Sequence, residues 1–558
     1  MSRIDSPKPL GRWLAAVLLA LAPSLVWAQA ATKTAPAKAV NAAACFGCHT
    51  QIKTFYDVGK HKSTGCATCH GGLEAHLANA SQAPSTDTSL KLCGSCHKEQ
   101  YETAAQMDWH RLARSDKKLY WNPAPNPSFD LLMTPNAFTK EHNLPRSHTF
   151  ALLDQFLVDR AFGGRFEPKD GWQYLAKSGD MKLQEMIVDK YPDNTDQKVF
   201  RPGTAAAANP VCLSCKTQDM ILEWAYLGDP APRAKWSRTS KVVEMGKSVN
   251  HSLNCIFCHD PHATKPRVVR DALIQALTRT DFPTLYSEDP RKTKFEVQDV
   301  GMRGFPRKIA FLERYDSKLQ CAQCHVEYNC NPGFNPNTGE AITMADPRTN
   351  VFPFVNVFQV SKFYDQIQFR DFRNQFTGAA LTKAQHPDTE IYWGSKHDKA
   401  GVECASCHMP RIENKKTGKV YTSHWQANPK DYLKETCLRC HSQWDEKQAK
   451  YVIESLYQRT QAKMRHAEFW LDLLVNKFME AQALGVSDDV IKAARAKHGE
   501  AHINWEWWTA ANAAGFHNPE QAHLSLANSV TYSQEGIKIL DDAMKTKRAA
   551  LQPVADKK

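Results

Sequence analysis

Sixteen of the seventeen cysteines in this 558-residue chain fall into Cys-x-x-Cys pairs, a spacing that constrains the fold more than any other feature. Seven of the eight pairs are followed at once by histidine, and the eighth is followed by Lys216. Two thiols at this spacing add across the vinyl groups of a haem, and the next side chain reaches the iron. Zinc ribbons give no reason for histidine to follow immediately, and a thioredoxin-like motif would occur once. The sequence therefore predicts eight covalently attached c-type haems.

The predicted attachment residues follow directly from the motifs. The thioether cysteines are Cys45, Cys48, Cys66, Cys69, Cys93, Cys96, Cys212, Cys215, Cys255, Cys258, Cys321, Cys324, Cys404, Cys407, Cys437 and Cys440. The proximal iron ligands are His49, His70, His97, Lys216, His259, His325, His408 and His441.

Residues 1–28 have the pattern of a secretory signal peptide. Arg3, Lys8 and Arg12 flank a short apolar run at 13–22, and small residues follow near Ala28. This pattern predicts export to the periplasm, with an uncleaved membrane anchor as the alternative. No apolar run of about 18 or more residues comes later, so we expect no membrane-spanning helix after the signal.

The distribution of motifs predicts the domain organisation. Residues 29–43 form a flexible lead-in, 44–110 a three-haem region, 111–441 a catalytic five-haem region, and 442–550 a helical region. Trp470, Leu474 and Phe478 repeat at helical spacing, Ser487 is placed to cap a second helix, and Asn518 a third. We expect a mainly α fold with little β structure, in which loops wrap the haems and long helices end the chain.

The net charge of +12 does not indicate a nucleic-acid partner, and we expect none. It is counted on the bare polypeptide, whereas each haem adds two propionates that the irons offset only in part.

Lys216 distinguishes one haem from the other seven. Seven haems with two histidine ligands each need seven distal histidines, and 22 histidines minus seven proximal ones leave 15. Such haems have no open iron position and only pass electrons. Axial-ligand identity strongly affects haem chemistry, so we interpret Lys216 as the proximal ligand of a five-coordinate catalytic haem. The alternative is that a histidine from elsewhere binds this iron.

Several motifs together carry a family resemblance. The segment Cys321-Ala-Gln-Cys-His-Val-Glu-Tyr328, the later Lys383-Ala-Gln-His386-Pro, and the Lys-terminated motif resemble the ammonia-forming cytochrome c nitrite reductases. The three additional N-terminal motifs, with 158–165 and 505–508, resemble the octahaem branch of that group over roughly residues 41–545. Octahaem hydroxylamine oxidoreductase is a related family.

The resemblance implies a catalytic pocket on the open face of the Lys216 haem. Arg160 would hold nitrite and stabilise charge as N–O bonds break, and His386 would donate protons. Tyr328 would pass protons or manage radicals, with Gln385 beside it. The resemblance to the octahaem branch also implies that Cys330 is joined to Tyr328 by a thioether. The alternative is that Cys330 is a buried free thiol.

The resemblance also implies a calcium ion and a set of distal histidines. Glu327 and Gln385 would bind calcium through side-chain oxygens, and Tyr328 and Lys383 through backbone carbonyls. The resemblance supports four distal ligands: His148, His397, His424 and His517. For the three N-terminal haems the candidates are His61, His76, His110, His142, His251 and His262, which spacing cannot pair. We interpret the remaining His466, His498, His502 and His523 as ordinary helix or surface residues.

The expected function is a periplasmic nitrite reductase that forms ammonium in a six-electron reduction, with hydroxylamine and sulfite as further implied substrates. Its electron donor would be a quinol dehydrogenase or another cytochrome, and the family implies a homo-oligomer, a trimer or hexamer. The alternatives are an octahaem hydroxylamine oxidoreductase, an octahaem tetrathionate reductase, and a non-enzymatic electron conduit. Lys216 argues against hydroxylamine oxidoreductase, because the catalytic haem of that family resembles a site with a histidine as proximal ligand.

Overall fold

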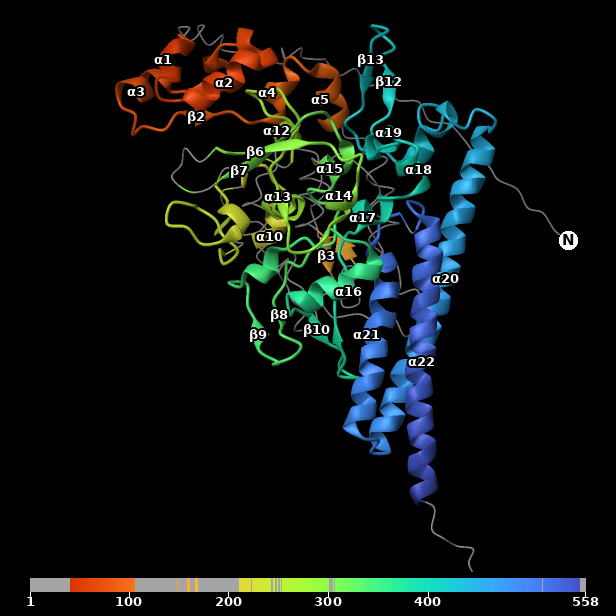
Figure 1. The fold of residues 1–558 in the computed structure, drawn as a ribbon. Coiled ribbons are helices and arrows are strands. Elements are labelled where there is room, and N and C mark those ends of the chain that lie inside the picture. The colour runs from red at the N-terminus through yellow and green to blue at the C-terminus, as the bar shows by residue number, and fades with distance from the viewer. Residues whose placement is uncertain are drawn as a thin grey trace, which may run out of the picture.

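The computed structural model describes most of the chain from residue 41 onward. The described residues are 41–105, 148, 158–160, 166–168, 210–221, 223–241, 244–245, 248, 251, 253–300, 305, 307–513 and 515–551. The predicted signal peptide lies outside them, as do His110 and His142. Figure 1 shows an N-terminal region at one end, a central body of loops and short elements, and long C-terminal helices along one side.

Three long helices end the chain: α20 (Glu446–Ala483), α21 (Asp488–Ala510) and α22 (Pro519–Leu551). They pack side by side in Figure 1 and bury a set of apolar side chains that includes Leu474 and Phe478. Asp445 caps α20 through a reciprocal bond with Gln448, whereas Ser487 occupies the N-cap position of α21 without a side-chain bond. Asn518 Oδ1 accepts a bond from the backbone of α22.

The N-terminal region is helical but has almost no apolar core. Its helices are α1 (Ala42–Phe46), α2 (Thr50–Val58), α3 (Leu73–Ala78), α4 (Leu90–Gly94) and α5 (Lys98–Ala105). Among residues 41–105 the buried hydrophobic side chains are Phe55 and Ala104. A small region with so few buried apolar side chains needs other groups to stabilise its interior, which fits a region whose core is made of cofactors.

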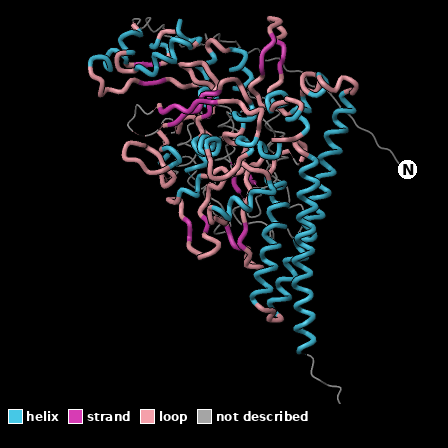
Figure 2. Tube along the Cα trace, in the orientation of Figure 1, coloured by secondary structure: helices cyan, strands magenta, loops and turns pink. Residues whose placement is uncertain are grey.

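The central body has larger apolar clusters and little sheet. Among the described residues, one sheet has three strands; it is antiparallel in the order β5 (Arg267–Val268), β7 (Lys308–Leu312), β6 (Phe295–Asp299). The buried helix α13 (Asp271–Thr278) packs beside β7, and α16 (Val357–Gln366) packs against α21. The other described sheets have two strands each. Figure 2 shows how far loops and helices outweigh strands, so the fold is mainly α as predicted.

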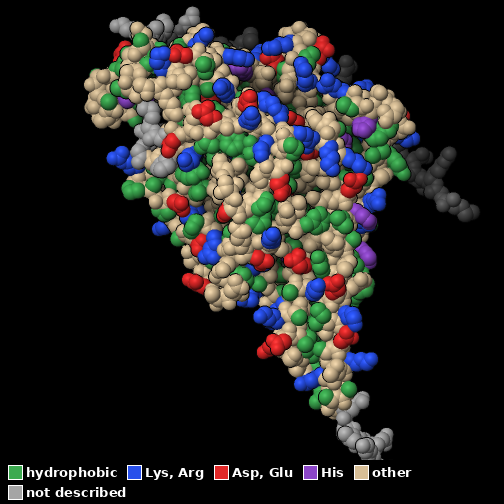
Figure 3. All heavy atoms as spheres, in the orientation of Figure 1, with side chains coloured by type: hydrophobic (Ala, Val, Ile, Leu, Met, Phe, Trp, Pro, Cys, Tyr) green, Lys and Arg blue, Asp and Glu red, His purple; other side chains and the backbone are tan. Residues whose placement is uncertain are grey.

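The surface carries charges of both signs. On the face in Figure 3, Lys and Arg side chains are interspersed with Asp and Glu. In the part of the chain that the structure describes, we find no helix with the length and apolar character needed to cross a membrane.

Candidate haem-ligand and catalytic site

Most of the attachment motifs share one local backbone geometry. In five of them the histidine N–H donates to the carbonyl of the first cysteine at 2.9 Å; these histidines are His49, His97, His259, His325 and His441. This bond closes a single helical turn, so both cysteines and the histidine project from one turn of backbone. Lys216 differs, because its N–H donates to Leu213 O at 3.1 Å.

Six motif histidines face a second histidine at nearly constant separation. The ring centres are 6.1 Å apart for His49–His76, His61–His97 and His70–His262, 6.2 Å for His408–His517, 6.3 Å for His397–His441, and 6.4 Å for His148–His325. Metal–imidazole bonds are about 2 Å long, so two imidazoles on opposite sides of one metal ion have centres about 6 Å apart. The spacing in these pairs therefore fits one iron between each two rings.

The outer nitrogens of these rings support the same interpretation. Nδ1 of His76 lies 2.8 Å from Gln82 O, Nδ1 of His61 lies 2.9 Å from Pro261 O, and Nδ1 of His408 lies 3.0 Å from Ala427 O. A carbonyl accepts only from a protonated nitrogen, so Nδ1 carries the hydrogen and Nε2 is left for a metal.

The seventh motif histidine, His259, lies near His424. Burial first, and then the charge of the nearby His424, lower the pKa of His259 to about 4. The neutral imidazole is the form that binds metal. His424 Nδ1 is 3.0 Å from Thr422 O, as in the other pairs.

His251, the remaining described candidate for a distal ligand, has a different environment. Its Nδ1 lies 2.9 Å from Asp219 Oδ1, and its backbone N–H donates to the same carboxylate at 2.7 Å. His498 and His502, interpreted from the sequence as helix or surface residues, lie in α21 and are completely buried.

The cysteines place neighbouring motifs close to one another in a continuous order. Side chains of different motifs lie within hydrogen-bonding reach in four pairs: Cys45–Cys66, Cys93–Cys255, Cys215–Cys324 and Cys321–Cys404. The Cys69 and Cys407 side chains lie close to Cys93 and Cys437, and Cys258 lies close to Cys321. Groups attached at these positions would form one path from the N-terminal region to Cys437, with the Lys216 motif beside Cys324.

The predicted catalytic residues of two distant segments meet in the central body. The Tyr328 and His386 rings are 6.3 Å apart, and Tyr328 packs on Phe352 at 5.8 Å. Gln385 Nε2 lies 3.8 Å from Cys330 Sγ, and both residues are buried. The side chain of Arg160, the third residue implied by the resemblance, lies outside the described part of the structure, although its backbone belongs to β3 (Val158–Arg160).

The predicted calcium ligands fit a hard cation in part. Glu327 is completely buried and accepts from Tyr364 Oη at 2.8 Å and from the Gln385 N–H at 2.6 Å. Burial raises the pKa of Glu327 well above its usual range, more than these bonds lower it, so a nearby cation would favour the carboxylate. The buried Gln385 Oε1 accepts no hydrogen bond from the described residues.

Side chains alone would not complete that calcium site. Within the described ranges, no group of three or more His, Cys, Asp or Glu is arranged to hold a metal ion. A calcium ion beside Glu327 would depend on Gln385 Oε1 and backbone carbonyls, as the resemblance implies.

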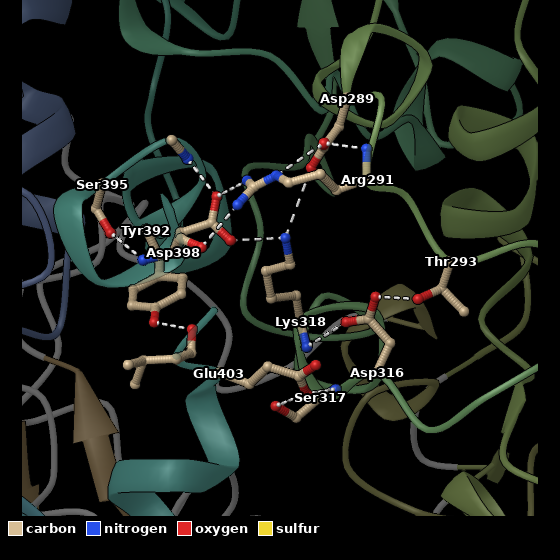
Figure 4. Close-up of polar contacts among 12 residues, drawn as sticks. Asp289, Arg291, Thr293, Asp316, Ser317, Lys318, Tyr392, Ser395, Asp398 and Glu403 are labelled. Carbon is tan, nitrogen blue, oxygen red and sulfur yellow. Dashed lines mark hydrogen bonds and ion pairs between the residues drawn. The ribbon is translucent and has the colours of Figure 1, made fainter. Parts of the chain in front are cut away.

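A charged cluster that could not be predicted from the sequence adjoins His397, and Figure 4 shows it in close-up. Asp398, next to His397 in α18 (Lys396–Lys399), accepts from Lys318 Nζ at 2.7 Å and from Arg291 Nη2 at 3.1 Å. Lys318 belongs to α15 (Ser317–Cys321), which leads into an attachment motif, and its ammonium lies 4.0 Å from the centre of the Trp393 ring. The cluster therefore ties the segment bearing His397 to the one bearing Cys321.

Comparisons with known proteins agree with this geometry. The family model described as Cytochrome c552 matches residues 184–557, more than half of the chain. A cytochrome c-552 from Haemophilus influenzae is 27% identical over 442 residues, which cover 76% of this chain and 69% of the relative. The cytochrome c nitrite reductase subunit NrfA of Nitratidesulfovibrio vulgaris is 28% identical over 428 residues, covering 73% and 67%.

A solved structure shows the same fold. The cytochrome c nitrite reductase from Desulfovibrio desulfuricans, whose catalytic subunit has two calcium sites, aligns with a TM-score of 0.55. The alignment covers 83% of this chain and 88% of that one at 20% identity. With the family match, this establishes that the chain is a multihaem cytochrome and belongs to the cytochrome c552 family.

Proposed function

We propose that this protein is an exported octahaem cytochrome that reduces nitrite to ammonium at the haem held by Cys212, Cys215 and Lys216. The observation that carries the proposal is the meeting of Tyr328 and His386, 6.3 Å apart, in a buried region where Cys215 contacts Cys324. The similarity to the nitrite reductase of Nitratidesulfovibrio vulgaris supports the substrate.

A haem at this position would supply an iron that binds the nitrogen atom and delivers electrons. The chain's own residues then have separate tasks. His386 donates hydrogen bonds and protons to the oxygens that leave, and Arg160 holds the anion. The Tyr328 ring packs on Phe352 and lies beside the His386 ring, so these contacts hold the Tyr328 side chain in place before substrate binds.

The seven histidine pairs would make up the electron path to this site. Electrons come from an external donor, and the ring separations of 6.1–6.4 Å support saturated, electron-transferring haems at six of these positions. We further propose a periplasmic location, a homo-oligomeric state and a calcium ion beside Glu327.

The experiment that tests the proposal is nitrite reduction by the purified protein with reduced viologen. The expected product is ammonium, with close to six electrons consumed per nitrite. Nitric oxide or nitrous oxide as the main product would refute the assignment. Faster oxidation of hydroxylamine than reduction of nitrite would favour the oxidoreductase alternative, and no turnover of either would favour a conduit.

A Lys216→His variant is expected to keep all eight haems while its high-spin signal and its nitrite turnover change. The cysteines still attach the haem, but imidazole replaces the amine as proximal ligand, and ligand identity affects the iron directly. Haem content by pyridine haemochrome, electron paramagnetic resonance and steady-state kinetics measure the three properties. Unchanged spectra and kinetics would show that Lys216 does not bind the catalytic iron.

We expect Tyr328 and Cys330 to be joined by a thioether. Both are buried, and two residues apart in an extended segment their side chains project to the same side. A thioether between the two side chains contains two hydrogens fewer than the free phenol and thiol, so a tryptic peptide spanning both residues should be lighter by two hydrogens and should resist alkylation at Cys330. Normal alkylation of Cys330 in that peptide is the contrary result.

A further inference from the structure

One buried carboxylate lies between two of the proposed iron ligands. Asp388 begins the short helix α17 (Asp388–Tyr392), two residues after His386, and is 6% exposed. Its Oδ2 lies 3.5 Å from His325 Nδ1, and its Oδ1 lies 3.8 Å from His517 Nδ1. Each carboxylate oxygen thus faces the outer nitrogen of a different ring.

The two rings belong to different haem positions. His325 follows Cys324 and faces His148, whereas His517 faces His408, the histidine that follows Cys407. These attachment motifs are neighbours, because the Cys321 and Cys404 side chains lie within hydrogen-bonding reach. A single carboxylate therefore lies within 4 Å of the outer nitrogens of two histidines that we assign to adjacent haems.

Contacts from several segments fix this carboxylate in place. The Asn512 backbone N–H donates to Oδ1 at 3.0 Å, and the Asn512 side-chain amide donates to Oδ2. The Thr389 N–H donates to His325 O at 3.0 Å, and Asn518 Nδ2 donates to Ile391 O at 3.1 Å. The second bond ties α17 to the segment that carries His517, so both rings are held to the same helix.

This arrangement has a definite consequence for bound iron. With Nε2 on the iron, Nδ1 carries the hydrogen and points toward the carboxylate, the carboxylate–histidine–metal arrangement found in many metal sites. A nearby negative charge makes the imidazole a stronger donor and stabilises the ferric iron, which carries one more positive charge than the ferrous iron. The reduction potential of each haem then falls.

We propose that Asp388 is a positioning residue that lowers the reduction potentials of two neighbouring haems together, those on Cys321/Cys324 and on Cys404/Cys407. The proposal rests on the ligand assignments of the proposed function. Because both potentials fall together, the driving force between the two haems is kept. Both become stronger reductants toward the haem at Lys216, whose motif contacts Cys324.

The test is a redox titration of the whole protein and its Asp388→Asn variant, followed by optical and electron paramagnetic resonance spectra. Asparagine keeps the shape and removes the charge, so two of the haem midpoints should rise while the others and the haem content stay unchanged. Asp388→Glu, which keeps the charge, should restore part of the shift. The matched control is Glu468→Gln, because Glu468 is equally buried but accepts from Trp505 Nε1 at 3.2 Å.

In an Asn512→Leu variant the two midpoints should shift in the opposite direction. This variant tests the effect of the Asp388 carboxylate even if Asp388→Asn does not fold. It removes both donors that compete for the carboxylate, so the two midpoints should fall. Unchanged midpoints in the folded variants would overturn the proposal. A shift in the midpoint of one haem alone would overturn the claim that Asp388 acts on two haems. Failure of the unmodified protein to form ammonium would contradict the proposed function. The redox titration would still test the role of Asp388, because it measures haem midpoints and not turnover.

Discussion

A His386→Ala variant is expected to retain its haems and to reduce nitrite about 10²–10⁴-fold more slowly, the usual contribution of a positioned proton donor. Nitrite must gain eight protons on its way to ammonium, and the cleavage of each N–O bond needs a proton at the leaving oxygen. The His386 ring lies beside Tyr328 in the buried region where two distant segments meet. Steady-state kinetics with reduced viologen measure the loss.

The kinetic parameters separate two roles for His386. Loss of a proton donor lowers kcat, whereas loss of a binding contact raises KM with kcat unchanged. His466→Ala is the matched control, since His466 lies exposed on α20 and accepts from Trp470 Nε1 at 3.1 Å. The control should turn over nitrite at the unmodified rate. Equal rates in both variants would remove His386 from the reaction.

Local features of the fold could be predicted from the sequence because they depend on neighbouring residues. The helical spacing of Leu474 and Phe478 predicts a helix, and these residues are buried in α20. The small N-terminal core also follows, since a segment with three attachment motifs in so few residues has little room for an apolar interior.

Long-range partners could not be predicted in the same way. His70 faces His262, and His148 faces His325, which are far apart in the chain, and no local pattern specifies such a pair. Asp388 and Asp398 were missed for the same reason. Asp388 did offer one signal, its place directly after the Gln-His-Pro segment, but its function depends on reaching two rings that the sequence does not place together.

An Asp398→Ala variant is expected to lose about 3–5 kcal/mol of unfolding free energy, because it leaves a buried ammonium without its carboxylate. Asp398 is 3% exposed, and Lys318 Nζ lies 2.7 Å from it. Asp289 is the other carboxylate near this ammonium, at 3.7 Å, too far to replace the bond. The loss is measured as a lower urea midpoint with the slope of the transition unchanged.

Asp542→Ala is the matched control for that measurement. Asp542 pairs with Lys538 at the same distance of 2.7 Å, but both side chains are more than 60% exposed, so water and salt screen the pair. Exposed pairs of this kind contribute only about 0.3–0.5 kcal/mol. If both variants lost the same small amount, the cluster in Figure 4 would not stabilise the fold. A spectrum tests whether Asp398 also affects the placement of His397. Because His397 adjoins Asp398 and faces His441, Asp398→Ala should change the low-spin spectrum of one haem, whereas Asp542→Ala should not.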